Sequence, residues 1–203
     1  IGLLGGFVMS FGFIAFVFAM MNTSVANVVF TISTQTIFLA LFGYFYLKEK
    51  ISLIGLLSII LAMMGISIMI NDSVSSGTLF GNLLALTIPI SFSIYVMILR
   101  KNSNLDLIPA IWYASIFSIL YSLVMVDSFS FTNNDIFMGF LLGVPQLTFG
   151  FVCITIGSRT TRSVTIGLLM LTETIFAPLW VWLFLNEIPP LSVFIGGTVI
   201  IFA

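Results

Sequence analysis

Eight stretches of predominantly apolar residues divide this sequence, and each is close to the length that a helix needs to cross a lipid bilayer. Short polar or turn-forming segments such as NDSVSSG at 71–77 and NEIPP at 186–190 separate them. About 20 apolar residues span the hydrocarbon core, and only helices or closed barrels satisfy their backbone there. The predicted fold class is therefore all-α, a polytopic integral membrane protein with eight transmembrane helices near residues 2–20, 24–47, 52–70, 78–99, 106–126, 136–157, 163–185 and 190–203.

Composition narrows the function. Sixty per cent of the residues are hydrophobic and only 6% are charged, and the net charge of −1 offers no basic surface for a nucleic acid. The chain has no histidine and a single cysteine, Cys153, which argues against an internal disulfide, a Cys/His metal cluster and Ser-His catalysis. We therefore expect no metal, no cofactor, no nucleic-acid partner and no enzymatic activity.

Basic residues occur only in every second loop. Counted from the N-terminus, these are the second, fourth and sixth loops, and acidic residues at 72, 127, 135 and 187 fall in the alternate ones. Lys and Arg are enriched on the cytoplasmic side of membrane proteins. The pattern predicts a multi-pass protein of the inner (cytoplasmic) membrane whose first span runs outward, with a cytoplasmic location for Lys48, Lys50, Arg100, Lys101, Arg159 and Arg162.

A shift of 138 residues aligns the chain with itself. Residues 10–14 (SFGFI) fall on 148–152 (TFGFV), and 34–38 (TQTIF) fall on 172–176 (TETIF), without a gap. The first three spans then correspond to the last three. Because five crossings separate each pair, the two copies have opposite orientations. Inverted-topology repeats are typical of secondary transporters that work by alternating access.

Two segments carry a resemblance to a known family. TQTIFLALFGYFYLKEKISLIG (34–55) and TETIFAPLWVWLFLNEIPPLSVFIGG (172–197) resemble the paired EamA repeats of the drug/metabolite transporter superfamily. The resemblance implies ten helices in two inverted repeats that export or import small metabolites. Residues 1–70 would be the end of the first repeat and 78–203 the second, with about two helices expected before Ile1. Members often carry Glu-Pro where this chain has Glu173-Thr174 and a displaced Pro178.

The candidate binding site centres on Glu173, an ionisable residue in the middle of the span 163–185. A charged residue at this depth costs about 2.5–3.5 kcal/mol on insertion scales, and such residues usually mark transport pathways. Glu173 would neutralise a substrate ammonium or carry a proton. The alternative is a protonated, structural Glu bonded to a neighbouring helix. The predicted cavity residues are Glu173, its repeat equivalent Gln35, and Phe42, Tyr95, Gln146, Met170 and Trp180.

Several other residues are expected to have structural roles. Pro89, Pro145 and Pro178 are expected to bend their spans, either at a cavity or only for packing. Glu49 and Glu187, at turns between helices, are expected to cap a helix or pair locally. The glycines are expected to allow close helix packing, among them Gly5, Gly6, Gly12, Gly143, Gly150, Gly196 and Gly197.

These observations predict a secondary transporter that moves a small organic metabolite, amino acid-like or otherwise amphipathic, by alternating access. Its partners would be that solute and the lipid bilayer, with proton coupling through Glu173. The alternatives are a channel, or a structural membrane subunit without carrier activity. A membrane-embedded enzyme would need a convergent catalytic constellation, which the sequence does not offer.

Overall fold

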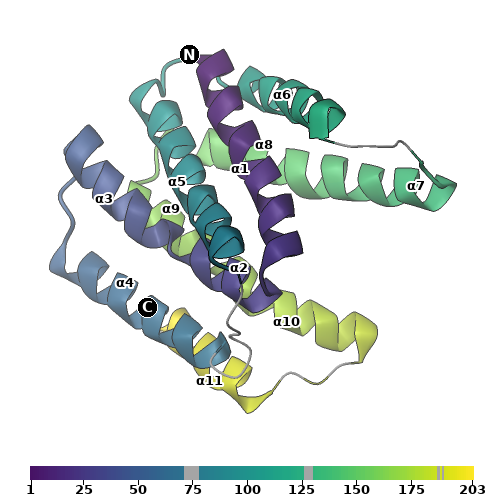
Figure 1. Ribbon diagram of the computed structural model, residues 1–203. Helices are drawn as coiled ribbons and strands as arrows, with labels where there is room; N and C mark the ends of the chain where they lie inside the picture. The colour runs from purple at the N-terminus through teal and green to yellow at the C-terminus, as the bar shows by residue number, and fades with distance from the viewer. Residues whose placement is uncertain (71–77, 126–129, 187, 189) are drawn as a thin grey trace.

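The computed structural model describes residues 1–70, 78–125, 130–186, 188 and 190–203. Asp72, Asp127 and Glu187, three of the predicted loop acids, lie outside the described residues. Every regular element of the described part is helical (Figure 1). The elements are α1 (Gly2–Asn22), α2 (Val25–Ser33), α3 (Gln35–Leu47), α4 (Leu53–Ile70), α5 (Leu79–Lys101), α6 (Pro109–Met125), α7 (Asn133–Leu141), the π-helix η1 (Leu142–Thr148), α8 (Phe149–Gly157), α9 (Ser163–Met170), α10 (Thr172–Leu185) and α11 (Leu191–Ile201).

These elements combine into the eight predicted spans. Five helical stretches of the described chain are long and apolar enough to cross a membrane. Three of them run through consecutive elements, namely α2–α3, α7–η1–α8 and α9–α10. The remaining three spans are the shorter apolar helices α4, α6 and α11. The prediction of an all-α, eight-helix membrane protein is confirmed.

Contacts between loops identify the two ends of the bundle. At one end Arg159 of the sixth loop pairs with Asp106 of the fourth at 3.1 Å, and Lys101 Nζ donates to the hydroxyl of Tyr46 at 3.2 Å. At the other end Thr78, at the start of α5, donates from Oγ1 to the carbonyl oxygen of Asn22 at 2.6 Å. The second, fourth and sixth loops therefore share one end, which we call the basic end, and the first loop lies at the opposite end.

The core is built by helices that approach closely over small residues. α1 packs between α5 and α6, and α4 packs along α11 (Figure 1). At Gly6 a Cβ atom would lie 2.5 Å from Cβ of Tyr113 and 2.7 Å from the carbonyl oxygen of Ala110. At Gly196 it would lie 2.3 Å from the carbonyl oxygen of Gly65. Such approaches are typical of membrane helices, where packing rather than hydrophobicity drives association.

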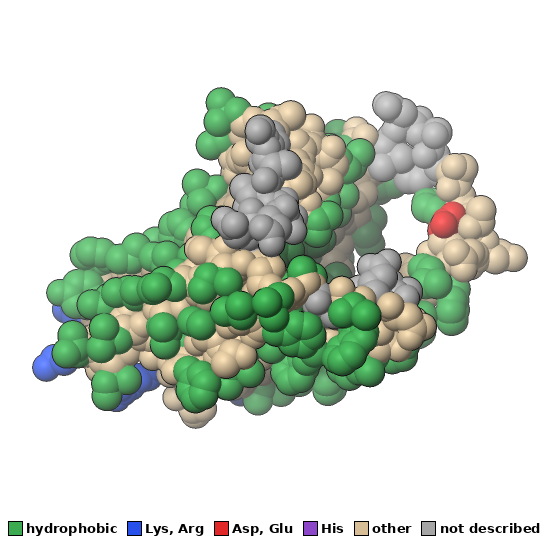
Figure 2. Space-filling model, turned by 90° about the horizontal axis from the view of Figure 1, so that it is seen from below, with side chains coloured by type: hydrophobic (Ala, Val, Ile, Leu, Met, Phe, Trp, Pro, Cys, Tyr) green, Lys and Arg blue, Asp and Glu red, His purple; other side chains and the backbone are tan. Residues whose placement is uncertain are grey.

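The outside of the bundle is apolar. Figure 2 shows hydrophobic side chains across one face, with Lys and Arg at one end of the view and an acidic side chain at the other. Large side chains such as Phe45, Ile54 and Phe184 are exposed on different helices. A surface of this kind suits a lipid environment, in which apolar side chains need no cover.

The expectation about glycines needs correction at two positions. At Gly143 and Gly150 a Cβ atom would meet no described atom within 4 Å apart from those of its own stretch of helix, so neither glycine mediates close packing here. Gly143 lies in η1, which buries no residue, and Gly150 lies in α8, where only Thr155 is buried. Pro145 lies in the π-helix, an element frequent at functional sites, whereas α5 runs through Pro89 without interruption.

Candidate functional site

Two spans are kinked near their centres. Between α2 and α3 the helical pattern tightens, because the Thr34 amide donates to Thr31 O at 3.1 Å, three residues back instead of four. Between α9 and α10 the Leu171 amide donates to Leu168 O in the same way, at 3.1 Å. A 3₁₀-like turn inside a helix often marks a hinge. Neither kink contains a proline.

Local hydroxyl groups explain these kinks. Thr34 Oγ1 donates to the carbonyl oxygen of Thr31 at 2.5 Å, and Ser33 Oγ donates to that of Val29 at 2.8 Å. In the second kinked span Thr172 Oγ1 donates to the carbonyl oxygen of Leu169 at 2.7 Å. Hydroxyl groups bonded back to the preceding turn compete with the backbone ladder and bend helices.

The shift found in the sequence also relates structural features. Lys48 and Asn186, which are 138 residues apart, end α3 and α10 in the left-handed conformation, with φ of 55° and 56°. They are the only described non-glycine residues with positive φ. Phe13 and Phe151, also 138 residues apart, touch each other with ring centroids 5.2 Å apart. Residues that the shift relates to each other therefore meet at this contact.

Gln35 and Glu173 lie at the two kinks in different surroundings. Gln35 begins α3 and is only 6% exposed. Glu173 lies in the first turn of α10 and is exposed. Its carboxylate has no hydrogen-bond or ion-pair partner in the part of the chain that the structure describes. The first turn of a helix favours a negative charge, because the unpaired amides there carry partial positive charge.

The other predicted cavity residues divide into two groups. Tyr95 is 1% exposed, and Phe42 and Met170 pack against the same buried cluster. Gln146, in the π-helix, is exposed, as is Trp180, which contacts Phe184 with ring centroids 5.9 Å apart. The structure thus brings three of the predicted residues together and leaves Gln146 and Trp180 on the outside of the described helices.

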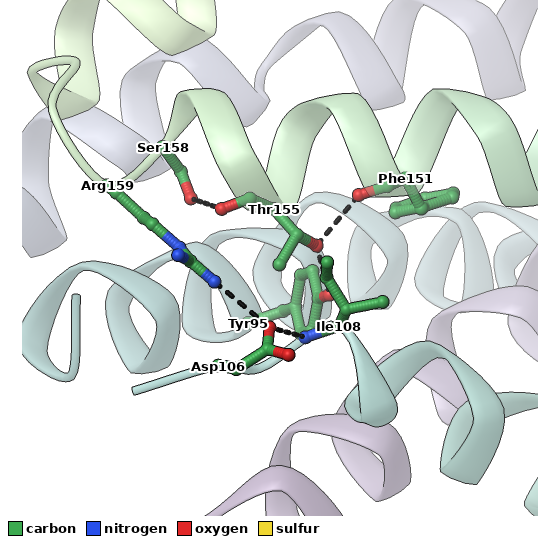
Figure 3. Close-up of polar contacts among 7 residues, drawn as sticks. All are labelled: Tyr95, Asp106, Ile108, Phe151, Thr155, Ser158 and Arg159. Atoms are coloured by element: carbon green, nitrogen blue, oxygen red, sulfur yellow. Dashed lines mark hydrogen bonds and ion pairs between the residues drawn. The ribbon is translucent and has the colours of Figure 1, made fainter. Parts of the chain in front are cut away.

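A polar seam that the sequence did not predict joins α5 to α8 (Figure 3). The Tyr95 hydroxyl lies 2.9 Å from Oγ1 of Thr155, which in turn donates to the carbonyl oxygen of Phe151 at 2.7 Å. Since the only hydroxyl proton of Thr155 is used on Phe151, Tyr95 is the donor of the first bond. Thr155 was detectable in principle, as a single hydroxyl in the apolar run of α8.

This seam predicts an asymmetric mutational response. Thr155→Val leaves the buried Tyr95 hydroxyl without an acceptor and should lower the free energy of unfolding by about 1–3 kcal/mol. Tyr95→Phe removes the donor and should cost about 1 kcal/mol. The double variant should cost less than the sum of the two, measured by unfolding in detergent micelles. Strictly additive costs would contradict the assigned bond.

The two kinked spans cross each other next to their kinks. Thr36 donates from Oγ1 to the carbonyl oxygen of Gly167 at 3.1 Å, and a Cβ atom on Gly167 would lie 2.8 Å from Cα of Thr36. Through this crossing α3 packs along α9. The 138-residue shift maps α3 onto α10 and α9 onto α2, yet α2 and α10 make at most marginal contact. The pair α3 and α9 is therefore in contact at the basic end, whereas the equivalent pair α10 and α2 is separated at the opposite end.

Glu49 makes two contacts at the basic end. Its Oε2 accepts a hydrogen bond from the Ser163 amide, the first of α9, at 3.0 Å, and its Oε1 pairs with Nη2 of Arg100. The expected cap is present. The pairing with Arg100 is not local, because that residue is 51 positions away in the sequence, and the capped helix begins 114 positions away. A helix-packing contact, rather than the turn itself, brings them to Glu49.

The described residues offer little else for a ligand. No three described His, Cys, Asp or Glu side chains converge as metal ligands would. A shallow groove of about 550 Å³ lies on the outer side of α3 and α4. It is lined by apolar residues and Ser67, whose hydroxyl is already bonded to the carbonyl oxygen of Met63 at 2.8 Å. The groove therefore has no free polar group that could orient a solute.

The kinked apolar spans, and a mid-span carboxylate without a partner among the described residues, are features of a polytopic membrane protein and are found among transporters. The chain belongs to the EamA-like transporter family, whose model matches residues 1–71 and 79–203. The resemblance stated from the sequence is confirmed.

Two similar proteins extend this comparison. A protein of Clostridium kluyveri described as an uncharacterized transporter is 27% identical over an alignment of 199 residues, which covers 91% of this chain and 63% of that relative. The chain thus spans less than two thirds of the relative's length. A solved structure, described only as the crystal structure of a protein, matches with a TM-score of 0.84 over 98% of this chain and 72% of its own. At 15% identity this likeness shows the fold alone.

Proposed function

We propose that the chain forms the larger part of a secondary transporter that moves a small organic metabolite across the cytoplasmic membrane by alternating access. The observation that carries the proposal is the unequal packing of equivalent elements. α3 packs along α9 at the basic end, whereas their repeat equivalents α10 and α2 make at most marginal contact. A protein built from an inverted repeat can adopt two conformations in which the repeats exchange their arrangements. The change from one conformation to the other opens a central site to the opposite side of the membrane.

The matched kinks supply the hinge that this exchange needs. The two kinks lie within one residue of positions that the 138-residue shift relates. Each kink divides its span into two halves that can move separately. Small rotations at such points carry a packed helix pair apart at one end and together at the other. The crossing at Thr36 and Gly167 lies beside both kinks and acts as the pivot.

Glu173 provides the substrate contact in this proposal. Its carboxylate has no partner among the described residues, which favours a role in binding over the structural alternative. An ammonium group would pair with it, and the apolar residues around the kink would accept the rest of an amphipathic solute. We propose an amino acid-like or similar small metabolite as the substrate, with a proton as its competitor for Glu173.

The test is substrate counterflow in proteoliposomes that hold the natural protein containing this chain, with a panel of labelled amino acids and metabolites. Glu173→Gln should lower saturable counterflow by about 30-fold or more, since losing one partner of a desolvated charge pair costs about 2–5 kcal/mol. Membrane insertion should be unaffected, because a neutral amide is easier to insert than a carboxylate.

Glu173→Asp serves as the matched control, because it keeps the charge and should retain part of the counterflow. Unchanged uptake by Glu173→Gln at every pH would remove Glu173 from the site. Flux without saturation or counterflow would instead indicate a channel.

A further inference from the structure

We propose that Glu49, Arg100 and the first turn of α9 form a latch that holds the basic end of the transporter shut, and that its opening admits solute from that side. The proposal rests on the proposed alternating-access function. It assigns the gate to a particular carboxylate, which is distinct from the binding carboxylate Glu173.

A single carboxylate joins three segments that are distant in the sequence. Glu49 follows α3, Arg100 lies in the last turn of α5, and Ser163 begins α9. One oxygen of Glu49 pairs with Arg100, and the other accepts the hydrogen bond from the Ser163 amide at 3.0 Å. Separation of α3 from α9, which inward opening requires, must break the bond to Ser163.

The backbone around Glu49 is shaped for this contact. Lys48 takes the left-handed conformation, and the Glu49 amide donates to the carbonyl oxygen of Gly43 at 3.0 Å, which turns the chain sharply after α3. A Cβ atom on Gly43 would lie 2.9 Å from Cβ of Ser163 and 3.0 Å from Oε2 of Glu49. Gly43 therefore provides the room in which α9 and the carboxylate meet.

In the closed latch some buried hydrogen-bond donors have no acceptor among the described residues. The side chain of Arg100 is only 14% exposed, yet its Nε and Nη1 have no partner among the described residues. The buried hydroxyl of Ser163 also lacks one there. Buried donors without acceptors oppose the gain from the ion pair. The unpaired donors therefore reduce the stability of the closed state, which favours a change of population.

Cysteine accessibility tests the latch without a substrate. In the natural protein, with Cys153 replaced by alanine, Met97→Cys places a thiol in the buried cluster one turn before Arg100, and Ala85→Cys places one in a buried cluster near the other end of α5. A membrane-impermeant maleimide is applied from the basic end. Glu49→Gln keeps an acceptor for Ser163 but removes the charge, and should speed labelling at position 97 about tenfold, within the range of typical couplings. Labelling at position 85 should not change.

Two further variants make the result decisive. Arg100→Gln should reproduce the effect of Glu49→Gln from the other partner. Asp106→Asn breaks the second described ion pair at the same end, in which Asp106 is 68% exposed, and should leave both labelling rates unchanged. Equal acceleration at positions 97 and 85 would indicate general loosening and overturn the latch, as would no acceleration at either.

The labelling result is independent of transport. Accelerated labelling at position 97 together with absent counterflow for the wild type would uphold the latch and reject the proposed function. Saturable counterflow together with unaltered labelling would reject the latch alone.

Discussion

Gly196→Ala is expected to destabilise the protein more than a methyl group added at any other described glycine. The new Cβ atom would lie 2.3 Å from the carbonyl oxygen of Gly65, 2.4 Å from Cγ of Met69 and 2.9 Å from the Met69 amide nitrogen. Two of these atoms belong to the backbone of α4, so a side-chain rotation cannot relieve the clash and α4 and α11 must separate. We expect a loss of about 3 kcal/mol or more, or a Tm lower by about 6–12 °C, measured by thermal unfolding in detergent.

Gly197 is a matched control in the same helix. A Cβ atom there would meet only Cγ2 of Ile175, at 4.0 Å, an ordinary van der Waals distance. Gly197→Ala should therefore be neutral, or stabilising by up to about 1 kcal/mol through helix propensity. Equal destabilisation by the two variants would contradict the packing of α4 on α11.

Gly6→Ala is expected to have the second-largest effect, at the contact of α1 with α6. Its Cβ atom would lie 2.5 Å from Cβ of Tyr113, 2.7 Å from the carbonyl oxygen of Ala110 and 2.8 Å from the amide nitrogen of Ala114. All three atoms are fixed to the helix backbone. We expect a loss of about 2–3 kcal/mol and a smaller folded fraction, measured by the monodisperse peak in size-exclusion chromatography.

Gly5→Ala is the corresponding control. Its Cβ atom would contact Ala110 and Tyr95 at 3.6 Å, which needs no movement of the helices. The folded fraction should then match the wild type. A loss caused by Gly5→Ala but not by Gly6→Ala would mean that α1 is rotated about its axis relative to α5 and α6.

Hydropathy was sufficient to predict the spans, because the bilayer fixes both the length and the polarity of a crossing helix. It did not distinguish Gly6 from Gly5 or Gly196 from Gly197, since adjacent residues differ only in the direction that each presents to a neighbour. The same limit applies to Glu49. Its turn was predicted, but Arg100 and Ser163 reach it through the packing of separate helices.

The candidate site was predicted less completely than the fold. The self-similarity of the sequence gave Gln35 and Glu173 equivalent positions, and the structure makes one buried and the other exposed. Sequence equivalence cannot express this difference, because burial depends on how each segment packs against the other helices. The binding roles of both residues stay predictions, which the counterflow experiment addresses. Tyr95 was predicted as a hydrogen-bonding residue, but its partner Thr155 was not, because a lone Thr in an apolar helix gives no pairing signal.

The packing of α4 on α11 has a consequence for how the protein is made. α4 ends at Ile70 and α11 begins at Leu191. At the usual rate of synthesis, α4 therefore enters the bilayer on the order of ten seconds before α11 has been made. Until then α11 does not cover the face of α4 that carries Gly65. The sequence of α4, LIGLLSIILAMMGISIMI, is apolar around the whole helix, so α4 is stable in lipid before α11 is present. The contact between Gly65 and Gly196 can therefore form only late in synthesis, after α11 has entered the bilayer.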